Sequence, residues 1–208
     1  MKGRITAAAL LMAAGAALPA QAQMGGRGGG GDYGPTPHAS VPSDERVAPV
    51  SRDAVSIAQD LRLQGKCDKA LAMLRRLAER GPGFEISQFD LGLCLFDLAK
   101  PQKDAQAAAQ MRGEAAQWVL RAANAGFAKA QAKAVVLYLD AMGLDADPVE
   151  AEKWAILYHG NAMRFSIGLP DIAPELESRL DTALNDKTRA EAEARANAWT
   201  PTASVAEE

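Results

Sequence analysis

Apolar residues recur along most of this chain at the three- and four-residue spacing of an α-helix. Between residues 67 and 80 the apolar stripe consists of Ala70, Leu74, Leu77 and Ala78. No stretch alternates apolar and polar residues with the period of two that a half-buried strand requires. Glycine and proline interrupt the pattern at intervals that suit short helices. The pattern therefore predicts an all-α fold of about seven or eight helices from residue 51 onward.

The interruptions also set the expected helix boundaries. We expect helices over residues 52–64, 67–80, 85–99, 103–125, 127–142, 148–161 and 186–198, and one more that begins at Pro174. Asp147 before Pro148 is typical of a helix N-cap followed by proline in the first helical position. Asn185 is expected to cap the last helix, which would close the end of the fold.

Spacings within the helical region repeat. Ala70 is followed eleven residues later by Gly81, and Ala115 is followed eleven residues later by Gly126. Ala151 then stands three residues before a tryptophan, as Ala115 does. Separations of three and four place residues on one helical face, so the repeated positions predict equivalent packing positions in successive helix pairs. These positions are Ala70, Gly81, Leu91, Gly92, Ala115, Trp118, Gly126, Gln131, Tyr138, Ala151 and Trp154.

Two of the three tryptophans, Trp118 and Trp154, occupy the same place in this repeat. One interpretation is that both pack in the core, filling the space between neighbouring helices. The other is that one or both form a platform for a ligand, because tryptophan is enriched at binding hot spots.

The segment from "EAAQWVLRAANAG" to "AEKWAILYH" resembles the Sel-1-like repeat family, which is related to tetratricopeptide repeats. The match includes Ala115, Trp118, Gly126, Gln131 and Tyr138, while Ala134-Val135 replaces the Leu-Gly of the family pattern. Residues 57–81 look more like a tetratricopeptide helix pair. The resemblance covers about 51–201 and implies a right-handed solenoid of helical hairpins with a C-terminal capping helix. It says little about function.

The N-terminus has a different composition. Residues 1–22 combine a basic start, a short apolar run and an Ala-Gln-Ala cleavage site, which predicts a secretory signal peptide. Residues 23–50 are rich in glycine and proline and predict a disordered tether. We therefore expect a helical repeat domain over 51–200, a flexible tail over 201–208, and an exported protein in a bacterial periplasm or secreted. No transmembrane segment is expected after signal cleavage.

The formal net charge is −3, and the signal segment holds two of the basic residues. A mildly acidic protein has no electrostatic footprint for nucleic acid. Composition thus argues against nucleic-acid partners.

The two cysteines, Cys67 and Cys94, fall on helices that would form an antiparallel hairpin, about one turn out of register. Cysteine pairs tend to form disulfides in exported proteins. Two separate buried thiols and a catalytic thiol are the alternatives, and neither cysteine has an evident histidine base.

Candidate chemistry is otherwise sparse. His159 is the only histidine of the helical region, and no carboxylate or cysteine is spaced to complete a metal site with it. No nucleophile elbow, metalloprotease or phosphate-loop motif occurs. The sequence predicts no catalytic residues, no cofactor and no metal.

We therefore expect a periplasmic interaction module, an adaptor, scaffold or regulator of an envelope process, that is a monomer alone. Its protein or peptide partner would bind the concave face of the helix stack. The alternatives are a structural subunit of an envelope complex and an enzyme acting on an envelope substrate. The second alternative follows from cysteine-rich relatives in the resembled family that are linked to β-lactams, although this chain has only two cysteines.

Overall fold

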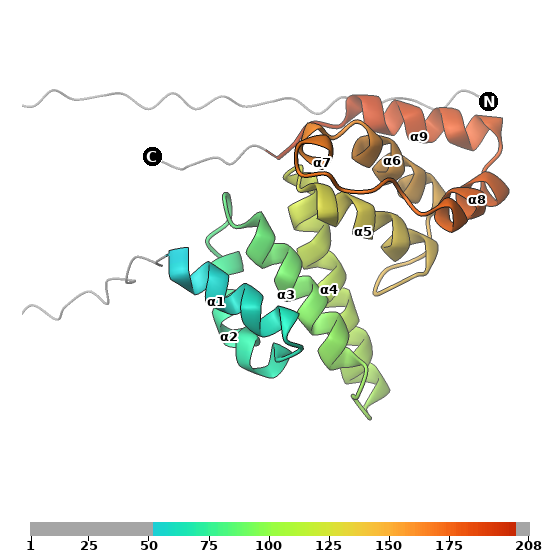
Figure 1. The fold of residues 1–208 in the computed structure, drawn as a ribbon. Helices are drawn as coiled ribbons and strands as arrows, with labels where there is room; N and C mark the ends of the chain where they lie inside the picture. Colours follow the sequence, from blue (N-terminus) through green and yellow to red (C-terminus); the bar gives the residue numbers. More distant parts are fainter. Residues whose placement is uncertain (1–51, 203–208) are drawn as a thin grey trace, which may run out of the picture. The chain divides into compact units, whose positions relative to one another are not determined.

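The computed structural model describes residues 52–202 of the chain. The predicted signal peptide, the predicted tether, Ser51 and residues 203–208 lie outside the described residues. The described part contains nine α-helices and no strand. The helices are α1 (Arg52–Leu63), α2 (Cys67–Ala78), α3 (Glu85–Ala99), α4 (Ala105–Asn124), α5 (Ala128–Leu139), α6 (Pro148–His159), α7 (Ala162–Ser166), α8 (Pro174–Ala183) and α9 (Asp186–Ala198) (Figure 1).

The all-α class predicted from the sequence is confirmed, and the helix starts agree closely with the turn signals. The Asp147 side chain caps α6 by accepting hydrogen bonds from the backbone N–H groups of Val149 and Glu150. Asn185 caps α9 through a capping box with Thr188. The expected number of seven or eight helices is wrong, because the described residues also form the single-turn helix α7. Five residues are too few to show a helical period, so only the N-cap Asn161 marks this helix in the sequence.

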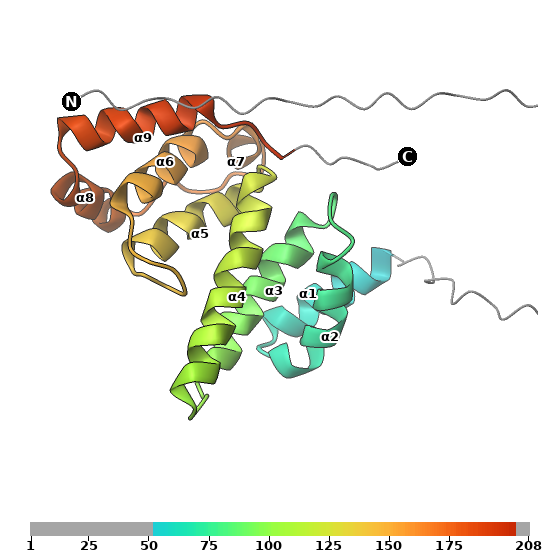
Figure 2. The same ribbon diagram turned by 180° about the vertical axis from the view of Figure 1, so that it is seen from behind.

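Helices pack mainly against their neighbours in the chain. Helix α3 lies between α2 and α4, α5 lies between α4 and α6, and α9 returns to pack on α6. Figures 1 and 2 show this succession from opposite sides, with α4 running between the group α1–α3 and the group α5–α9. The core is therefore built from sequential interfaces, each shared by two or three helices.

Equivalent glycines end two of these helices. Gly81 follows α2 with φ 83°, and Gly126 follows α4 with φ 87°. The backbone N–H of Gly81 donates to Ala78 O, and that of Gly126 donates to Ala123 O. A residue with a side chain is disfavoured at such φ values. The repeated glycines of the sequence thus share one structural role, which is to end a helix so that the next can return along it.

Small residues let α3 and α4 approach closely. Ala115, Ala116, Ala122 and Ala123 of α4 are fully buried. Gly92 of α3 lies so near α4 that an added Cβ atom would be 2.6 Å from Val119 Cγ2 and 2.8 Å from Ala115 O. The second contact is with backbone, so a side-chain rotation cannot relieve it.

We expect Gly92→Ala to lower the free energy of unfolding by about 2 kcal/mol, because α3 and α4 must separate to admit the methyl group. Gly113→Ala is the matched control: Gly113 is also helical, and its added Cβ atom would make only an ordinary 3.7 Å contact with Gly143 O. The control should be neutral or stabilising, since alanine favours helices by up to about 1 kcal/mol over glycine. Urea denaturation measures both, and equal effects would refute the close approach.

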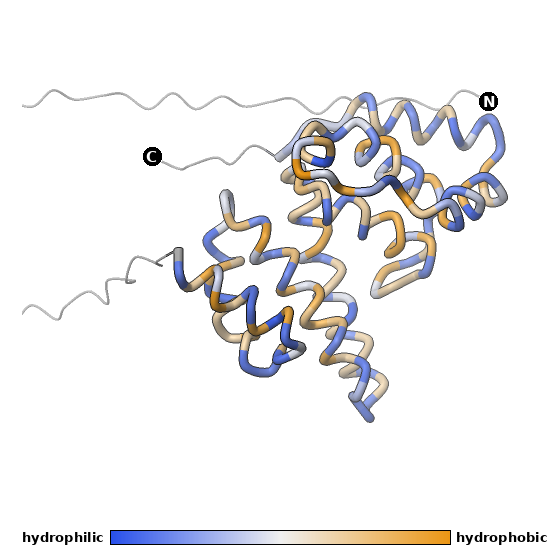
Figure 3. The backbone as a smooth tube through the Cα atoms, in the orientation of Figure 1, coloured by the Kyte–Doolittle hydropathy of each residue, from blue (hydrophilic) through white to orange (hydrophobic). Residues whose placement is uncertain are grey.

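The last helix covers α6 with a mostly polar sequence. Only Ala192 and Ala196 of α9 are buried, and hydrophilic residues recur along the helix (Figure 3). Ion pairs add to its attachment: Arg189 contacts Glu152 at 3.3 Å, and Arg195 contacts Glu150 at 2.7 Å. No helix within residues 52–202 is both long and apolar enough to cross a membrane.

Candidate functional site

The repeated positions of the sequence fall into two groups in the structure. Three of them are half-buried, namely Trp118, Gly126 and Tyr138. The others are buried: Ala70, Gly81, Leu91, Gly92, Ala115, Gln131, Ala151 and Trp154. The two tryptophans with the same place in the repeat therefore differ. Trp154 is 1% exposed, and only Trp118 is open to a partner.

The orientation of Trp118 is set by a chain of polar contacts from α2. Its indole N–H donates to Glu114 Oε1 over 3.3 Å. Glu114 also accepts two hydrogen bonds from the guanidinium of Arg75, one of them 3.0 Å long. The bond from Arg75 is the main reason why the pKa of Glu114 is lowered. A bidentate pair of this kind holds geometry well, so Trp118 is presented in a defined pose.

An exposed arginine lies beside this tryptophan. The guanidinium carbon of Arg121 is 5.5 Å from the centre of the Trp118 ring. The two residues line a surface hollow of about 460 Å³ on α4, which we call the α4 surface; its lining residues are Gln117, Trp118, Leu120, Arg121 and Asn124. Tryptophan and arginine are the residue types that most often dominate binding energy at protein interfaces. The α4 surface can thus contribute aromatic contact, positive charge and amide hydrogen bonds.

The chain returns to the end of α4 after its last helix. Residues Trp199–Thr202, which we call the strap, run past Asn124. Trp199 and Pro201 line a hollow of about 390 Å³ beside α6, and Thr202 lines one of about 220 Å³ that also contains Arg121. Three hollows thus surround the C-terminal end of α4.

No model of a known protein family matches the chain, and no curated protein matches it. The described residues form an all-helical fold with sequential helix packing and one disulfide. The resemblance to Sel-1-like repeats rests on the sequence motif itself.

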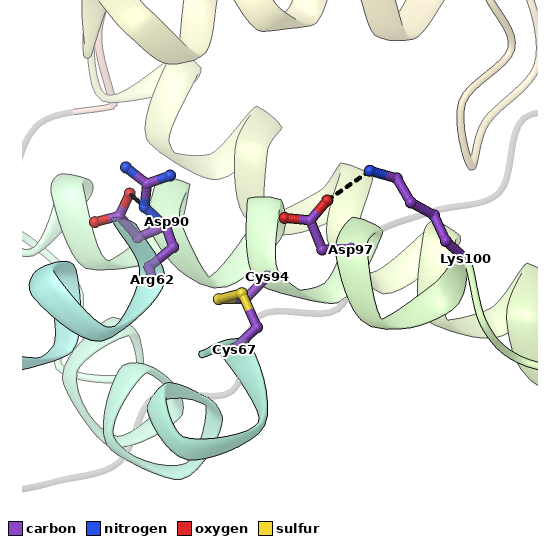
Figure 4. The surroundings of a disulfide bond; sticks show 6 residues. All are labelled: Arg62, Cys67, Asp90, Cys94, Asp97 and Lys100. Atoms are coloured by element: carbon purple, nitrogen blue, oxygen red, sulfur yellow. Dashed lines mark hydrogen bonds and ion pairs between the residues drawn. A yellow bond between two sulfur atoms is a disulfide. The ribbon is translucent and has the colours of Figure 1, made fainter. Parts of the chain in front are cut away.

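Cys67 and Cys94 form a disulfide (Figure 4). Both residues are buried, and their Cα atoms are 5.1 Å apart. Helix α2 begins at Cys67 without a capping side chain at Lys66, and the bridge joins this first residue of α2 to α3. A disulfide is consistent with an oxidising compartment outside the cytoplasm. Because both sulfur atoms are bonded and buried, neither is available as a nucleophile in this state.

An ion pair between a half-buried arginine and a buried aspartate lies near the disulfide, between α1 and α3 (Figure 4). Arg62 Nε is 2.5 Å from Asp90 Oδ1, and Asp90 is 2% exposed. Asp90 Oδ2 is buried with no hydrogen-bond partner among the described residues. Burial raises the pKa of Asp90 from 3.8 to about 6, against the opposing attraction of Arg62 and Lys129. The free-energy cost of removing the Asp90 carboxylate from water therefore exceeds the gain from its pairing with Arg62, as is often the case for buried charges.

The raised pKa predicts a pH-dependent component of stability. Between about pH 4 and 6 the folded state binds a proton at Asp90 that the unfolded chain releases, so this component is present at low pH and is lost as pH rises through 6. The free energy of unfolding of the wild type should fall by about 2 kcal/mol, relative to Asp90→Asn, between pH 4 and 7. Chemical denaturation at both pH values measures the difference, and parallel profiles would contradict the assignment.

No spacing in the sequence indicates carboxylate companions for His159, but the structure brings two of them to its ring. The loop after α7 and the start of α8 provide these carboxylates: Asp171 Oδ1 is 2.7 Å from His159 Nδ1, and Glu177 Oε1 is 3.7 Å from His159 Nε2. The three ligand atoms lie within 4.8 Å of one another. However, the carboxylates approach opposite ring nitrogens, and Arg164 already pairs with Asp171 at 3.0 Å. The arrangement fits a cluster of polar contacts that joins α8 and the loop before it to α6.

The sequence does not predict the roles of Arg121 and Asn124 or the contact of the strap with α4. None of them belongs to the repeat pattern, and the strap reaches α4 across 75 residues of sequence. The one available signal was Trp199, a large aromatic residue directly after a helix with few apolar side chains. Such a residue needs a partner elsewhere in the fold.

Proposed function

We propose that this protein is a helical-repeat interaction module of the bacterial periplasm that binds a protein or peptide and does not act as an enzyme. In this proposal its helix pairs stack as a right-handed solenoid of the Sel-1-like type. The neighbour-to-neighbour packing of helices and the equivalent roles of Gly81 and Gly126 support this stacking. The disulfide supports an oxidising location.

One observation carries the binding proposal: two tryptophans in equivalent repeat positions have different environments. Trp154 is fully enclosed, whereas Trp118 lies half-open over a hollow with Arg121 beside it. Packing alone would favour covering both rings, because burying an aromatic side chain is strongly stabilising. We infer that the α4 surface is the partner site, and that the partner covers Trp118.

The partner site is tested by site-specific photocrosslinking in the cell envelope. A photoreactive amino acid at Gln117, which is exposed and lines the α4 surface, should capture one reproducible partner. The matched control is Gln106, an exposed glutamine of the same helix, about 16 Å away at 1.5 Å per residue. Crosslinking at position 106 should capture the partner weakly or not at all.

Arg121→Ala should reduce the Gln117 crosslink at least tenfold, because it removes the exposed charge of the site. It should leave the unfolding midpoint almost unchanged, since Arg121 is exposed. A crosslink of equal strength in Arg121→Ala, or equal capture from positions 106 and 117, would refute the α4 surface as the partner site.

A structural subunit is the second candidate, favoured by an apolar cluster around α7. Met163, Phe165 and Ile167 are 51%, 65% and 51% exposed, while Arg164 between them is buried. Adjacent exposed apolar side chains often mark an association surface. If this candidate is right, the purified protein self-associates, and replacing the three residues by serine restores a monomer. Sedimentation of both proteins over a concentration range decides between a monomeric module and a subunit.

A further inference from the structure

The strap has the features of a bound peptide. Trp199 has φ −74° and ψ 137°, an extended backbone of the polyproline type. Thr200, Pro201 and Thr202 are exposed, and only Trp199 is half-buried. The strap therefore lies on the surface as an extended segment with one aromatic anchor, which is how many recognition peptides bind.

Each contact of the strap uses a group that a peptide from another chain could also reach. The backbone N–H of Thr202 donates to Asn124 O over 2.9 Å. This carbonyl is at the last residue of α4, where helix geometry leaves it without a partner in its own helix. The indole N–H of Trp199 donates to Asn124 Oδ1 over 3.4 Å. Asn124 thus contacts the strap through both its main chain and its side chain.

The aromatic anchor covers the tryptophan that is buried. The Trp199 ring meets the Trp154 ring edge to face, with centroids 6.4 Å apart. It lines the 390 Å³ hollow together with the buried Gln131 and with Asn161, which donates to Gln131 Oε1 over 2.7 Å. Among the described residues, two hydrogen bonds and one half-buried ring attach these four residues to α4 and α6, which is a small attachment. Such an attachment can open without unfolding the helices.

We propose that the strap occupies a site for an extended peptide at the end of α4, and that a partner peptide with an aromatic residue two positions before a proline displaces it. This inference rests on the proposed function and deepens it by naming the ligand chemistry and an intramolecular competitor. The strap's far end lines the 220 Å³ hollow beside Arg121. A displacing peptide can therefore continue from the strap's position toward the α4 surface.

The test uses the mature full-length protein and a fluorescent peptide with the sequence of residues 197–203. Thr202→Pro removes the N–H that donates to Asn124 O, because proline has no backbone N–H. Thr200→Pro is the matched control, because no hydrogen bond of the Thr200 N–H occurs among the described residues. In fluorescence anisotropy, Thr202→Pro should bind the peptide about fivefold more tightly than the wild type does. Thr200→Pro should bind as the wild type, and a peptide with Trp199→Ala should not bind to either.

A second readout follows the strap directly. The chain has three tryptophans, so its NMR spectrum has three side-chain indole N–H signals. Peptide binding should shift the Trp199 signal toward the position that it has in Thr202→Pro. Equal peptide affinities for Thr202→Pro and the wild type, with an unmoved Trp199 signal, would overturn the proposal and make the strap a structural cap. If the Gln117 crosslink persists in that case, the interaction module stands and only the strap inference fails.

Discussion

Trp154→Ala should lower the free energy of unfolding by about 3–5 kcal/mol, the range for removing a large aromatic side chain from a packed core. The ring is 1% exposed, packs edge to face against Trp199 and has the ammonium of Lys153 4.3 Å from its centre. Its removal leaves a cavity between α6 and the helices around it. Denaturant titration followed by circular dichroism measures the loss.

Trp118→Ala is the matched substitution at the equivalent position of the repeat. Trp118 is half-buried and makes one indole hydrogen bond to Glu114, so we expect a loss of only about 1–2 kcal/mol. The variant should fold and yet fail to give the Gln117 crosslink. If both alanine variants lose the same stability, Trp118 is a core residue and the α4 surface is not the partner site.

Removing the disulfide is the second large change. Cys67 and Cys94 are 27 residues apart in the sequence. For a loop of this length, loop-closure entropy predicts that the disulfide stabilises the folded state by about 3.5 kcal/mol. The double variant Cys67→Ala with Cys94→Ala should lose about this amount. The loss should appear in the free energy of global unfolding, because the bridge acts by restraining the unfolded chain.

Thiol titration provides the control for this prediction. The oxidised wild type, unfolded without reductant, should give no reactive thiol, and reduction should give two. Wild-type protein measured with reductant should match the stability of the double variant. A difference below about 1 kcal/mol between oxidised and reduced protein would show that the bridge hardly restrains the unfolded chain.

Helix boundaries could be predicted from the sequence wherever they depend only on residues near the helix end. Helix ends are fixed by interactions within a few residues. The helix starts are marked by proline in α6 and α8 and by the caps Asp147 and Asn185, and the ends of α2 and α4 are marked by glycine. The helix pattern and the class of the fold follow from these signals. Helix α7 was missed because one turn has too few residues to show a period.

Features that join distant segments could not be predicted in the same way. The repeat gives Trp118 and Trp154 the same place, but their different exposure depends on Trp199 and the return of α9, which lie outside the repeat. His159 likewise meets Asp171 and Glu177 only because the loop after α7 folds back. Local periodicity contains no information about such returns, so candidate sites that depend on them appear only in three dimensions.

The polar attachment of α9 also has a consequence for the order in which the protein opens. Ion pairs from Arg189 and Arg195 supplement a contact in which only two alanines of the helix are buried, and salt screens partly exposed pairs. Rising ionic strength should therefore speed amide hydrogen exchange in α9 well before it does so in α3, which is joined to α2 by a covalent bond. Because the strap follows α9 directly, the salt concentration of the surroundings would set how often Trp199 leaves its place.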